Sequence, residues 1–410
     1  MHKRTFLLYL LFFILFSVSV DGQSKLHAQV DDFVYEDTAT WTGRMQRLLD
    51  SLISLPLFET TQVGMYVRDL TAGRDIFLHN SRYRLRPASN QKVVTAIAAL
   101  RYLGGDYTYR TKLLLTGQVC DSILQGDIYV VGGMDPLLSQ GEVYQMALAL
   151  HEAGIDSLAG NICLDLTFKD RDDLGWGWCW DDDTTPLRPL MVDKKDDFVT
   201  EFLTDLNVVG IRGGSGDCVT NAECPPSARL FCEVTHTIEQ VLTRMMKKSD
   251  NYYAESMFYL LGARNGQKNV TRKDGATQVE RMIREVGLNP ADYQIADGSG
   301  VSLYNYLSPQ LLVRLLEYAW QHETIRRSLY PNLPIAGVDG TLEKRMRKTV
   351  AEGNVHAKTG TVNGVSSLSG YATSPEGHIL IFSIINQGIP KAQLGRDWQD
   401  KVCVVLCGGQ

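Results

Sequence analysis

Strand-like segments near both ends of the chain enclose a helical middle, and this order constrains the fold more than any other feature. Residues 64–70 alternate like a strand near the N-terminus, and residues 355–361 and 378–386 form strand-like runs near the C-terminus. Between residues 235 and 322 the pattern is that of several helices. Strands supplied from both ends predict one antiparallel sheet flanked by helices, which is an α+β fold.

Residues 107–234 differ from the rest of the chain in their sequence pattern. Strand-like runs alternate there with Gly-rich turns, and a Trp-rich acidic loop follows at residues 176–183. We therefore predict an inserted β-rich module over residues 107–234, placed within a discontinuous main domain formed by residues 23–106 and 235–410. Most of the eight cysteines fall in the insertion, namely Cys120, Cys163, Cys179, Cys218, Cys224 and Cys232.

The N-terminus has the layout of a secretory signal peptide. Lys3 and Arg4 precede an apolar run over residues 6–20, and the small residue Gly22 follows it closely. We predict a signal peptide over residues 1–22, with an uncleaved membrane anchor as the alternative. No later stretch is apolar enough to span a bilayer, so no integral membrane segment is expected after cleavage.

Composition excludes several classes of function. The chain has 44% apolar and 21% charged residues, as globular proteins do, and a formal net charge of −6. No long cluster of Lys and Arg is present, so the electrostatic signature of a nucleic-acid binder is missing. The histidines are scattered and the cysteines lack C-x-x-C spacing, so we expect structural cysteines and no metal site.

Ser89 and Lys92 form an S-x-x-K motif at the start of an apolar helix expected over residues 90–103. Backbone N–H groups at a helix N-terminus are unpaired, and the helix dipole there favours developing negative charge. Lys92 lies one turn later on the same face, and its apolar neighbours favour the neutral amine, which can accept the Ser89 proton. The pair therefore predicts a serine nucleophile with a lysine base. The plain alternative is a helix-capping serine beside a surface lysine.

A second motif, S-D-N, is formed by Ser249, Asp250 and Asn251 directly before another expected helix. Taken alone, it fits an ordinary helix cap or turn equally well. In the functional interpretation, Ser249 relays a proton to the leaving group and the Asn251 amide binds the substrate backbone. The presence of the other two motifs favours this interpretation.

The third motif, Lys358-Thr359-Gly360-Thr361, lies on an expected strand rather than in a loop. An edge strand can pair with an extended peptide. We expect the Thr361 N–H to join the Ser89 N–H in an oxyanion hole, and Lys358 with the Thr359 hydroxyl to hold a C-terminal carboxylate. Gly360 gives room for close approach. A solvated edge lysine is the alternative, but it does not explain the following Thr-Gly.

Motifs of these three kinds occur in this order in class A β-lactamases and penicillin-binding proteins. The chain as a whole resembles the S13 peptidase family, the class C low-molecular-mass penicillin-binding proteins, which are D-alanyl-D-alanine carboxypeptidases and endopeptidases. The resemblance covers nearly the whole mature chain. Beyond the three motifs, the segments that carry it are residues 126–136, 297–300, 308–309 and 333–342.

This resemblance implies a penicillin-binding transpeptidase fold with a five-stranded antiparallel sheet and an insertion between the first two motifs. It implies an acyl-enzyme on Ser89, proton acceptance by Lys92, proton shuttling by Ser249 and carboxylate binding by Lys358, with no metal or other cofactor. The implied substrates are peptidoglycan stem peptides ending in D-Ala-D-Ala, with β-lactams as covalent inhibitors, and the implied location is the periplasm or cell envelope. Two departures are a shorter insertion and Tyr304, where a basic residue is expected.

Two other functions fit parts of the sequence. A serine β-lactamase shares the acylation step, but such enzymes usually carry a Glu-bearing loop between the first two motifs, and the segment here is far longer. A non-catalytic envelope protein could use the same groove to hold peptide, although a binder has no need of both Lys92 and Ser249. A long-lived penicilloyl adduct on Ser89 would exclude the first alternative.

Overall fold

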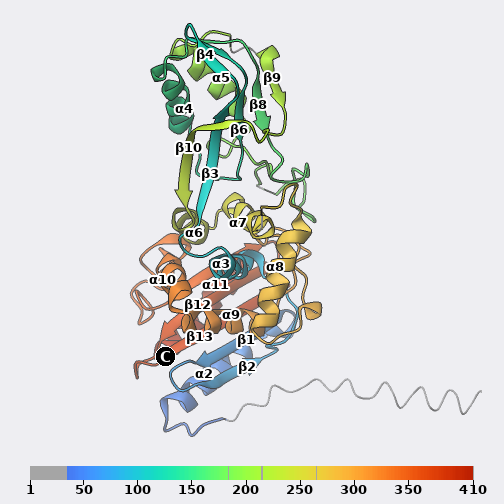
Figure 1. The fold of residues 1–410 in the computed structure, drawn as a ribbon. Coiled ribbons are helices and arrows are strands. Elements are labelled where there is room, and N and C mark those ends of the chain that lie inside the picture. The colour runs from blue at the N-terminus through green and yellow to red at the C-terminus, as the bar shows by residue number, and fades with distance from the viewer. Residues whose placement is uncertain (1–34, 183, 214–215, 265, 410) are drawn as a thin grey trace, which may run out of the picture.

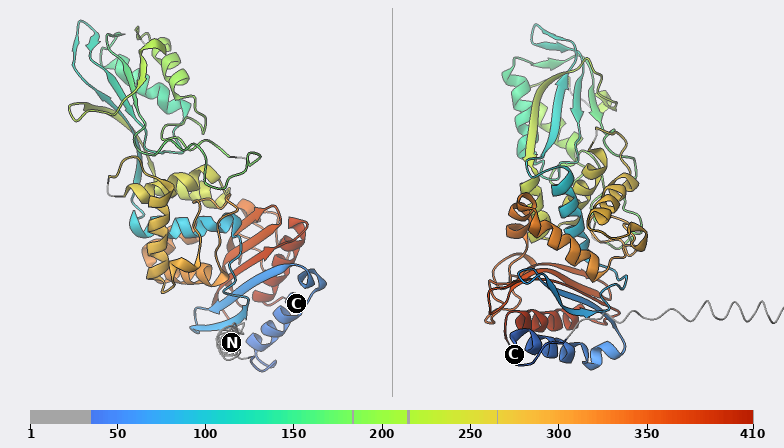
Figure 2. Two further views of the ribbon diagram at one scale, coloured as in Figure 1. Left: turned by 90° about the vertical axis from the view of Figure 1, so that its right-hand side faces the viewer. Right: turned by 60° about the horizontal axis from the view of Figure 1, so that its bottom comes forward.

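The computed structural model describes residues 35–409 apart from 183, 214–215 and 265, so the predicted signal peptide lies outside it. The described chain forms two lobes stacked end to end (Figures 1 and 2). The first and last described segments both lie in the lower lobe, and residues 108–237 build the upper one. None of the described helices combines the length and apolar character that crossing a membrane requires.

One five-stranded antiparallel sheet forms the centre of the lower lobe, with the order β11-β12-β13-β1-β2. Two strands come from the N-terminal part of the chain and three from the C-terminal part, which confirms the predicted sheet. The central strand β13 is buried on both faces, as its nearly continuous apolar sequence requires. The strands are β1 (Gln62–Asp69), β2 (Arg74–His79), β11 (His356–Val362), β12 (Val365–Thr373) and β13 (Ile379–Gln387).

Helices cover both faces of this sheet. Helix α9 packs directly on one face of the sheet, and α3 packs against the outer side of α9. Helices α2 and α11 cover the other face (Figure 2). Every residue of α3 from position 91 to 100 is buried, as expected for a helix that is apolar on all sides. The helices are α2 (Trp41–Ile53), α3 (Gln91–Tyr102), α6 (Ile238–Lys247), α7 (Asn251–Ala263), α8 (Arg272–Glu285), α9 (Pro309–Gln321), α10 (Glu323–Asn332) and α11 (Ala392–Leu406).

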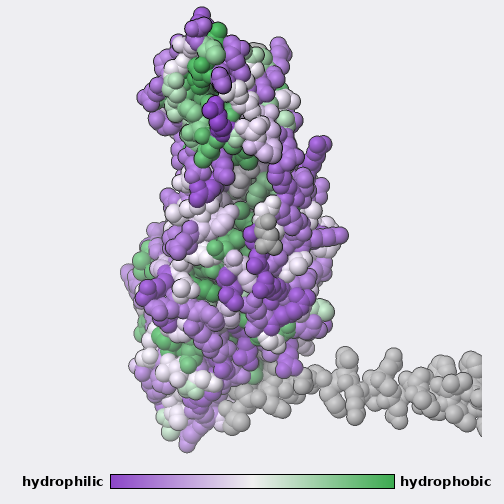
Figure 3. All heavy atoms as spheres, in the orientation of Figure 1, coloured by the Kyte–Doolittle hydropathy of each residue, from purple (hydrophilic) through white to green (hydrophobic). Residues whose placement is uncertain are grey.

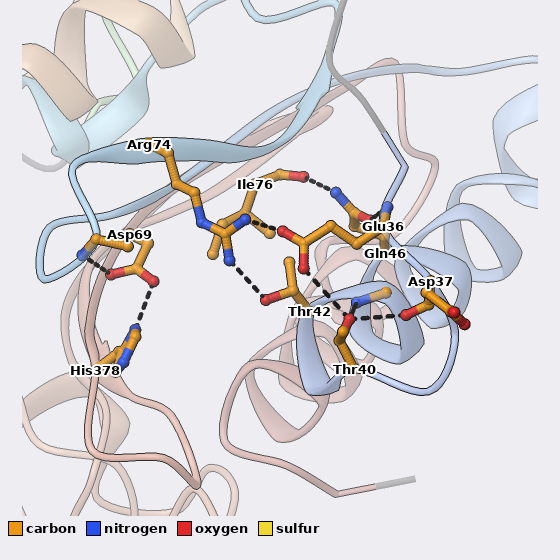
Figure 4. Close-up of polar contacts among 11 residues, drawn as sticks. Glu36, Asp37, Thr40, Thr42, Gln46, Asp69, Arg74, Ile76 and His378 are labelled. Atoms are coloured by element: carbon orange, nitrogen blue, oxygen red, sulfur yellow. Dashed lines mark hydrogen bonds and ion pairs between the residues drawn. The ribbon is translucent and has the colours of Figure 1, made fainter.

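Polar contacts fasten α2 and the N-terminal strands to the rest of the lobe (Figure 4). The Thr40 hydroxyl accepts a backbone N–H at the start of α2. The buried Gln46 amide donates to the Ile76 carbonyl on β2 at 2.9 Å. Asp69 at the end of β1 pairs with His378 at 2.7 Å, next to the start of β13. The first two contacts hold the N-terminal elements together, and the pair of Asp69 and His378 joins them to the C-terminal strands.

The upper lobe contains a mixed sheet with the order β10-β3-β6-β8-β9, two packed helices and a small three-stranded sheet. The sequence predicted the strands but missed the helices. Apolar side chains gather on this lobe and around the waist of the molecule (Figure 3). The elements are β3 (Thr108–Leu115), β4 (Gln118–Cys120), β5 (Ile123–Gln125), β6 (Ile128–Val131), α4 (Gln140–Glu152), β7 (Ser157–Leu158), β8 (Ile162–Asp165), α5 (Phe198–Val208), β9 (Val219–Asn221) and β10 (Arg229–Thr237).

Strands β3 and β10 run as a pair from the helical layer into the upper lobe (Figure 1). Thr237 ends β10 and also caps α6, so the chain passes into the lower lobe without a linker. The division into an inserted domain over residues 107–234 and a main domain around it stays a prediction.

Candidate active site

Ser89 lies in a short 3-10 turn (Ala88–Asn90) that leads into α3. Ala88 has a φ of +47°, a conformation that a non-glycine residue adopts only when its surroundings enforce it. One such constraint is the Ser367 hydroxyl on β12, which donates to the Pro87 carbonyl at 2.6 Å. The backbone around Ser89 is therefore held against the sheet.

The edge strand β11 approaches this turn closely at Gly360. A Cβ built at Gly360 would lie 2.9 Å from the Ser89 nitrogen and 2.8 Å from the Pro87 oxygen. Any larger residue would push the strand away from Ser89. The predicted need for glycine at this position therefore has a direct steric cause.

Lys92 places a fully buried amine beside Ser89. Its Nζ donates to Ser89 Oγ at 3.0 Å, to Asn251 Oδ1 at 2.8 Å and to the Ser299 carbonyl at 2.7 Å. These three acceptors match the three protons of an ammonium group. When one proton is lost, the amine lone pair can receive the proton of the Ser89 hydroxyl.

Burial of the Lys92 amine lowers its pKa to about 8. Three surrounding carboxylates act in the opposite direction and favour the charged form; they belong to Asp297, Glu255 and Asp250. A pKa near 8 leaves about a tenth of the lysines neutral at pH 7, against fewer than about one in a thousand for a free lysine. The burial of Lys92 therefore suits it to act as a base.

Lys358 on β11 is the second fully buried lysine of the site. Its Nζ donates to Ser249 Oγ at 2.8 Å and to the Thr359 carbonyl at 2.8 Å. Burial, and then the nearby Lys92, lower the pKa of Lys358 well below its usual value. Ser249 has a φ of +59°, so it too is held in an uncommon conformation.

Thr359 and Thr361 lie further along the same edge strand. The Thr359 hydroxyl donates to Thr341 Oγ1 at 2.7 Å, and the exposed Thr361 hydroxyl accepts from Arg396 at 3.3 Å. Neither side chain hydrogen-bonds to Ser89 in the described part of the chain. Both therefore line the edge beside the site, where an extended peptide would add to the sheet.

Sequence reasoning missed Glu255, which lies on α7 one turn after Asn251. Its carboxylate is buried and accepts backbone N–H groups from Gly298 at 3.1 Å and Ser299 at 2.8 Å. Burial, and then Asp297, raise the pKa of Glu255 to about 8. A charged residue within an otherwise apolar helix, one turn after Asn251, was the signal in the sequence.

Asp297 organises the loop that supplies the Ser299 carbonyl to Lys92. Its carboxylate accepts backbone N–H groups from Gly300 and Ser302, each at 2.7 Å. Asn305 donates to it at 2.7 Å, and Trp178 of the upper lobe donates to it from its indole at 2.9 Å. The loop that faces Lys92 is therefore fixed from both lobes.

A model of the D-Ala-D-Ala carboxypeptidase 3 (S13) family matches residues 45–196 and 190–406. The chain belongs to this family. The match includes all three motifs and confirms the family predicted from the sequence.

Two curated relatives of this S13 peptidase are both named D-alanyl-D-alanine carboxypeptidase. The chain is 28% identical over 435 residues to the D-alanyl-D-alanine carboxypeptidase of Actinomadura sp. (strain R39), covering 83% of this chain and 80% of that protein. It is 25% identical over 407 residues to the D-alanyl-D-alanine carboxypeptidase DacB of Haemophilus influenzae, covering 79% of this chain and 85% of that protein. The crystal structure of H. influenzae penicillin binding protein 4 (dacB) has the same fold, with a TM-score of 0.79 at 24% identity over 87% of this chain and 97% of that one.

The structure brings most of the predicted site residues of this S13 peptidase into two hydrogen-bonded groups. Lys92 joins Ser89 to Asn251, and Lys358 is bonded to Ser249. Because Ser249 and Asn251 flank Asp250 in the chain, the two groups adjoin one another. Within the described residues, no three His, Cys, Asp or Glu side chains are grouped as a metal site would require.

Proposed function

We propose that this S13 peptidase is a serine-type D-alanyl-D-alanine carboxypeptidase that forms an acyl-enzyme on Ser89. The observation that carries the proposal is the 3.0 Å contact between Ser89 Oγ and the fully buried Lys92 amine at the start of α3. The names of its relatives support peptides ending in D-alanyl-D-alanine as substrates, and we propose that these are the stem peptides of peptidoglycan. One of these relatives, H. influenzae penicillin binding protein 4, has also been solved with a bound β-lactam. We extend β-lactam acylation to this chain on that basis.

In the acylation step, Ser89 Oγ attacks the carbonyl carbon of the penultimate D-Ala and its proton passes to Lys92. The negative oxygen of the tetrahedral intermediate would be bound by the Ser89 and Thr361 N–H groups. The C–N bond then breaks, and the amine of the terminal D-Ala leaves with a proton delivered through Ser249. Water hydrolyses the resulting ester, which restores the Ser89 hydroxyl and releases the shortened peptide.

The other polar groups would hold the substrate in place. Asn251 uses its oxygen to accept from Lys92, which leaves its NH₂ group available for a substrate carbonyl. Lys358 and the Thr359 hydroxyl would bind the terminal carboxylate. A bound carboxylate favours the charged form of Lys358, which offsets the lowering of its pKa in the empty site. Removal of the carboxylate from the peptide would therefore weaken binding.

A fluorescent penicillin tests the proposal directly. We expect intact-mass analysis of the mature protein to show one stable penicilloyl adduct and peptide mapping to place it on Ser89. Release of D-Ala from a stem peptide ending in D-Ala-D-Ala would establish the peptidase, and a cross-linked muropeptide would test endopeptidase activity. Rapid hydrolysis of the drug without a lasting adduct would instead indicate a β-lactamase.

The substrate also bears on where the enzyme acts. Peptidoglycan lies outside the inner membrane, and a signal peptide over residues 1–22 would export the chain. We therefore place the enzyme in the periplasm or cell envelope.

The acylation rate should depend on pH through Lys92. Only the neutral amine can accept the Ser89 proton, so we expect the rate to rise with pH up to about 8, which is the pKa of Lys92. At lower pH it should fall about tenfold per unit as the amine becomes protonated. Stopped-flow acylation by a chromogenic β-lactam between pH 5.5 and 9.5 measures this profile.

Glu255→Gln should move the profile to lower pH. Glu255 itself has a pKa of about 8, so it becomes negatively charged over the same pH range in which Lys92 loses its proton. This charge raises the pKa of Lys92, and its removal therefore leaves more neutral amine near pH 8 and above. Gln keeps an oxygen at the position of Oε1, which accepts from both Gly298 and Ser299. A profile that is unchanged near pH 8 would show that the charge of Glu255 does not act on the group that sets the pH dependence.

A further inference from the structure

Helix α7 begins with Asn251 of the S-D-N motif and lies where the two lobes meet (Figure 1). The upper lobe is bonded to the N-cap of this helix and to two positions in its first two turns. Tyr252 and Ser256 are four residues apart and therefore lie on one side of the helix, so the contacts hold its N-terminal part at more than one point. The pairs are Lys194 with Asp250 at 3.0 Å, the Arg188 carbonyl with the Tyr252 hydroxyl at 2.9 Å, and the Met134 carbonyl with the Ser256 hydroxyl.

Lys194 comes from a strained turn of the upper lobe. Both Asp193 (φ +47°) and Lys194 (φ +64°) have left-handed backbone conformations. The turn is closed by a backbone bond from Val192 to the Lys195 carbonyl at 2.9 Å and tied to Leu138 by a bond from the Asp193 N–H at 2.9 Å. Strain of this kind persists where the surrounding structure enforces it, and it clusters at functional sites. This turn places the Lys194 amine within 3.0 Å of the Asp250 carboxylate.

The partner of Lys194 is in the S-D-N motif itself. Asp250 stands at the N-cap of α7, but its side chain makes no capping hydrogen bond. Its carboxylate is instead shared by Lys194 at 3.0 Å and Arg244 at 3.1 Å, with 9% of the side chain exposed. Asp250 joins Ser249 to Asn251, so this ion pair fixes the backbone between two residues of the site.

We propose that the upper lobe supplies a positioning residue to the active site, with Lys194 holding Asp250 and thereby setting Ser249 and Asn251 in place beside Lys358 and Lys92. The inference deepens the proposed function and rests on it. It gives the upper lobe a part in the reaction, since the geometry of the second motif then depends on Lys194, which lies 56 residues before Asp250 in the chain.

The test compares three variants by their acylation with a fluorescent penicillin, separating non-covalent binding from the acylation rate constant. Lys194→Met removes the charge and keeps the length, Lys194→Arg restores a cation, and Lys195→Met is the matched control because Lys195 is the exposed neighbour. We expect Lys194→Met to lower the acylation rate constant about tenfold. Lys194→Arg should recover most of it, and Lys195→Met should equal the wild type.

A double-mutant cycle separates positioning from general stability. Asp250→Asn should slow acylation at least as much as Lys194→Met, because it also removes the ion pair with Arg244. The double variant should lose little more than Asp250→Asn alone, because the contact with Lys194 is already broken. Unchanged acylation in Lys194→Met, or fully additive losses in the double variant, would overturn the inference. Absence of any adduct in the wild type would instead count against the proposed function, so the two failures are distinct.

Discussion

Replacing Ser89 with alanine is expected to lower D-Ala release by a factor of about 10⁴ or more and to remove the penicilloyl adduct. No other hydroxyl of the site can take its place, because Ser89 alone combines the 3.0 Å contact to Lys92 with a position at the start of α3. Ser249 is directed to Lys358 instead. The measurements are D-Ala release from a pentapeptide and intact mass after incubation with penicillin.

Ser374→Ala is the matched control for this substitution. Ser374 is a buried serine, whereas Ser89 is half-buried, and Ser374 lies in the turn between β12 and β13, at the other end of β12 from Ser367. We expect it to react with penicillin like the wild type. An adduct that persists in Ser89→Ala would show that another residue is the nucleophile, and peptide mapping would identify it.

The sequence was sufficient to predict those structural features that local residue patterns determine. Strand-like runs at both ends of the chain predicted one antiparallel sheet, and the family resemblance gave its five strands. The apolar pattern after Ser89 predicted a helix, which is buried. The motif spacing predicted the contact of Ser89 with Lys92, because residues three apart share a helix face. The contact between Lys358 and Ser249 spans 109 residues, and only the resemblance to a family placed these residues in one site.

Contacts between distant segments were not predictable in this way. Glu255 and Asp297 shape the surroundings of Lys92 through bonds to a loop whose path no local pattern reveals. Helices α4 and α5 were missed because they lie among short strands and Gly-rich turns. Helix α10 was missed because it is short, rich in charge and contains Pro331. The contact of Lys194 with Asp250 was not predictable either, since an isolated lysine in a loop is normally solvated.

Lys92→Met is expected to slow acylation of Ser89 by a factor of about 10³, which is within the range for loss of a general base. Methionine fills a similar volume in the buried site, but it can neither accept the Ser89 proton nor donate to Asn251 and the Ser299 carbonyl. The remaining slow reaction should lose the rise in rate toward pH 8, because the group that titrates there is gone.

Lys169→Met separates this effect from the general cost of removing a buried lysine. Lys169 is equally buried, but it pairs with Asp170 in the upper lobe and touches no residue of the three motifs. We expect Lys169→Met to reduce thermal stability while each folded molecule still reacts with penicillin at the wild-type rate. If Lys92→Met reacted at that rate as well, and with an unchanged pH profile, the proton would have to leave Ser89 by a route that does not involve Lys92. Lys92 would then not be the base that activates Ser89, even if Ser89 is the nucleophile.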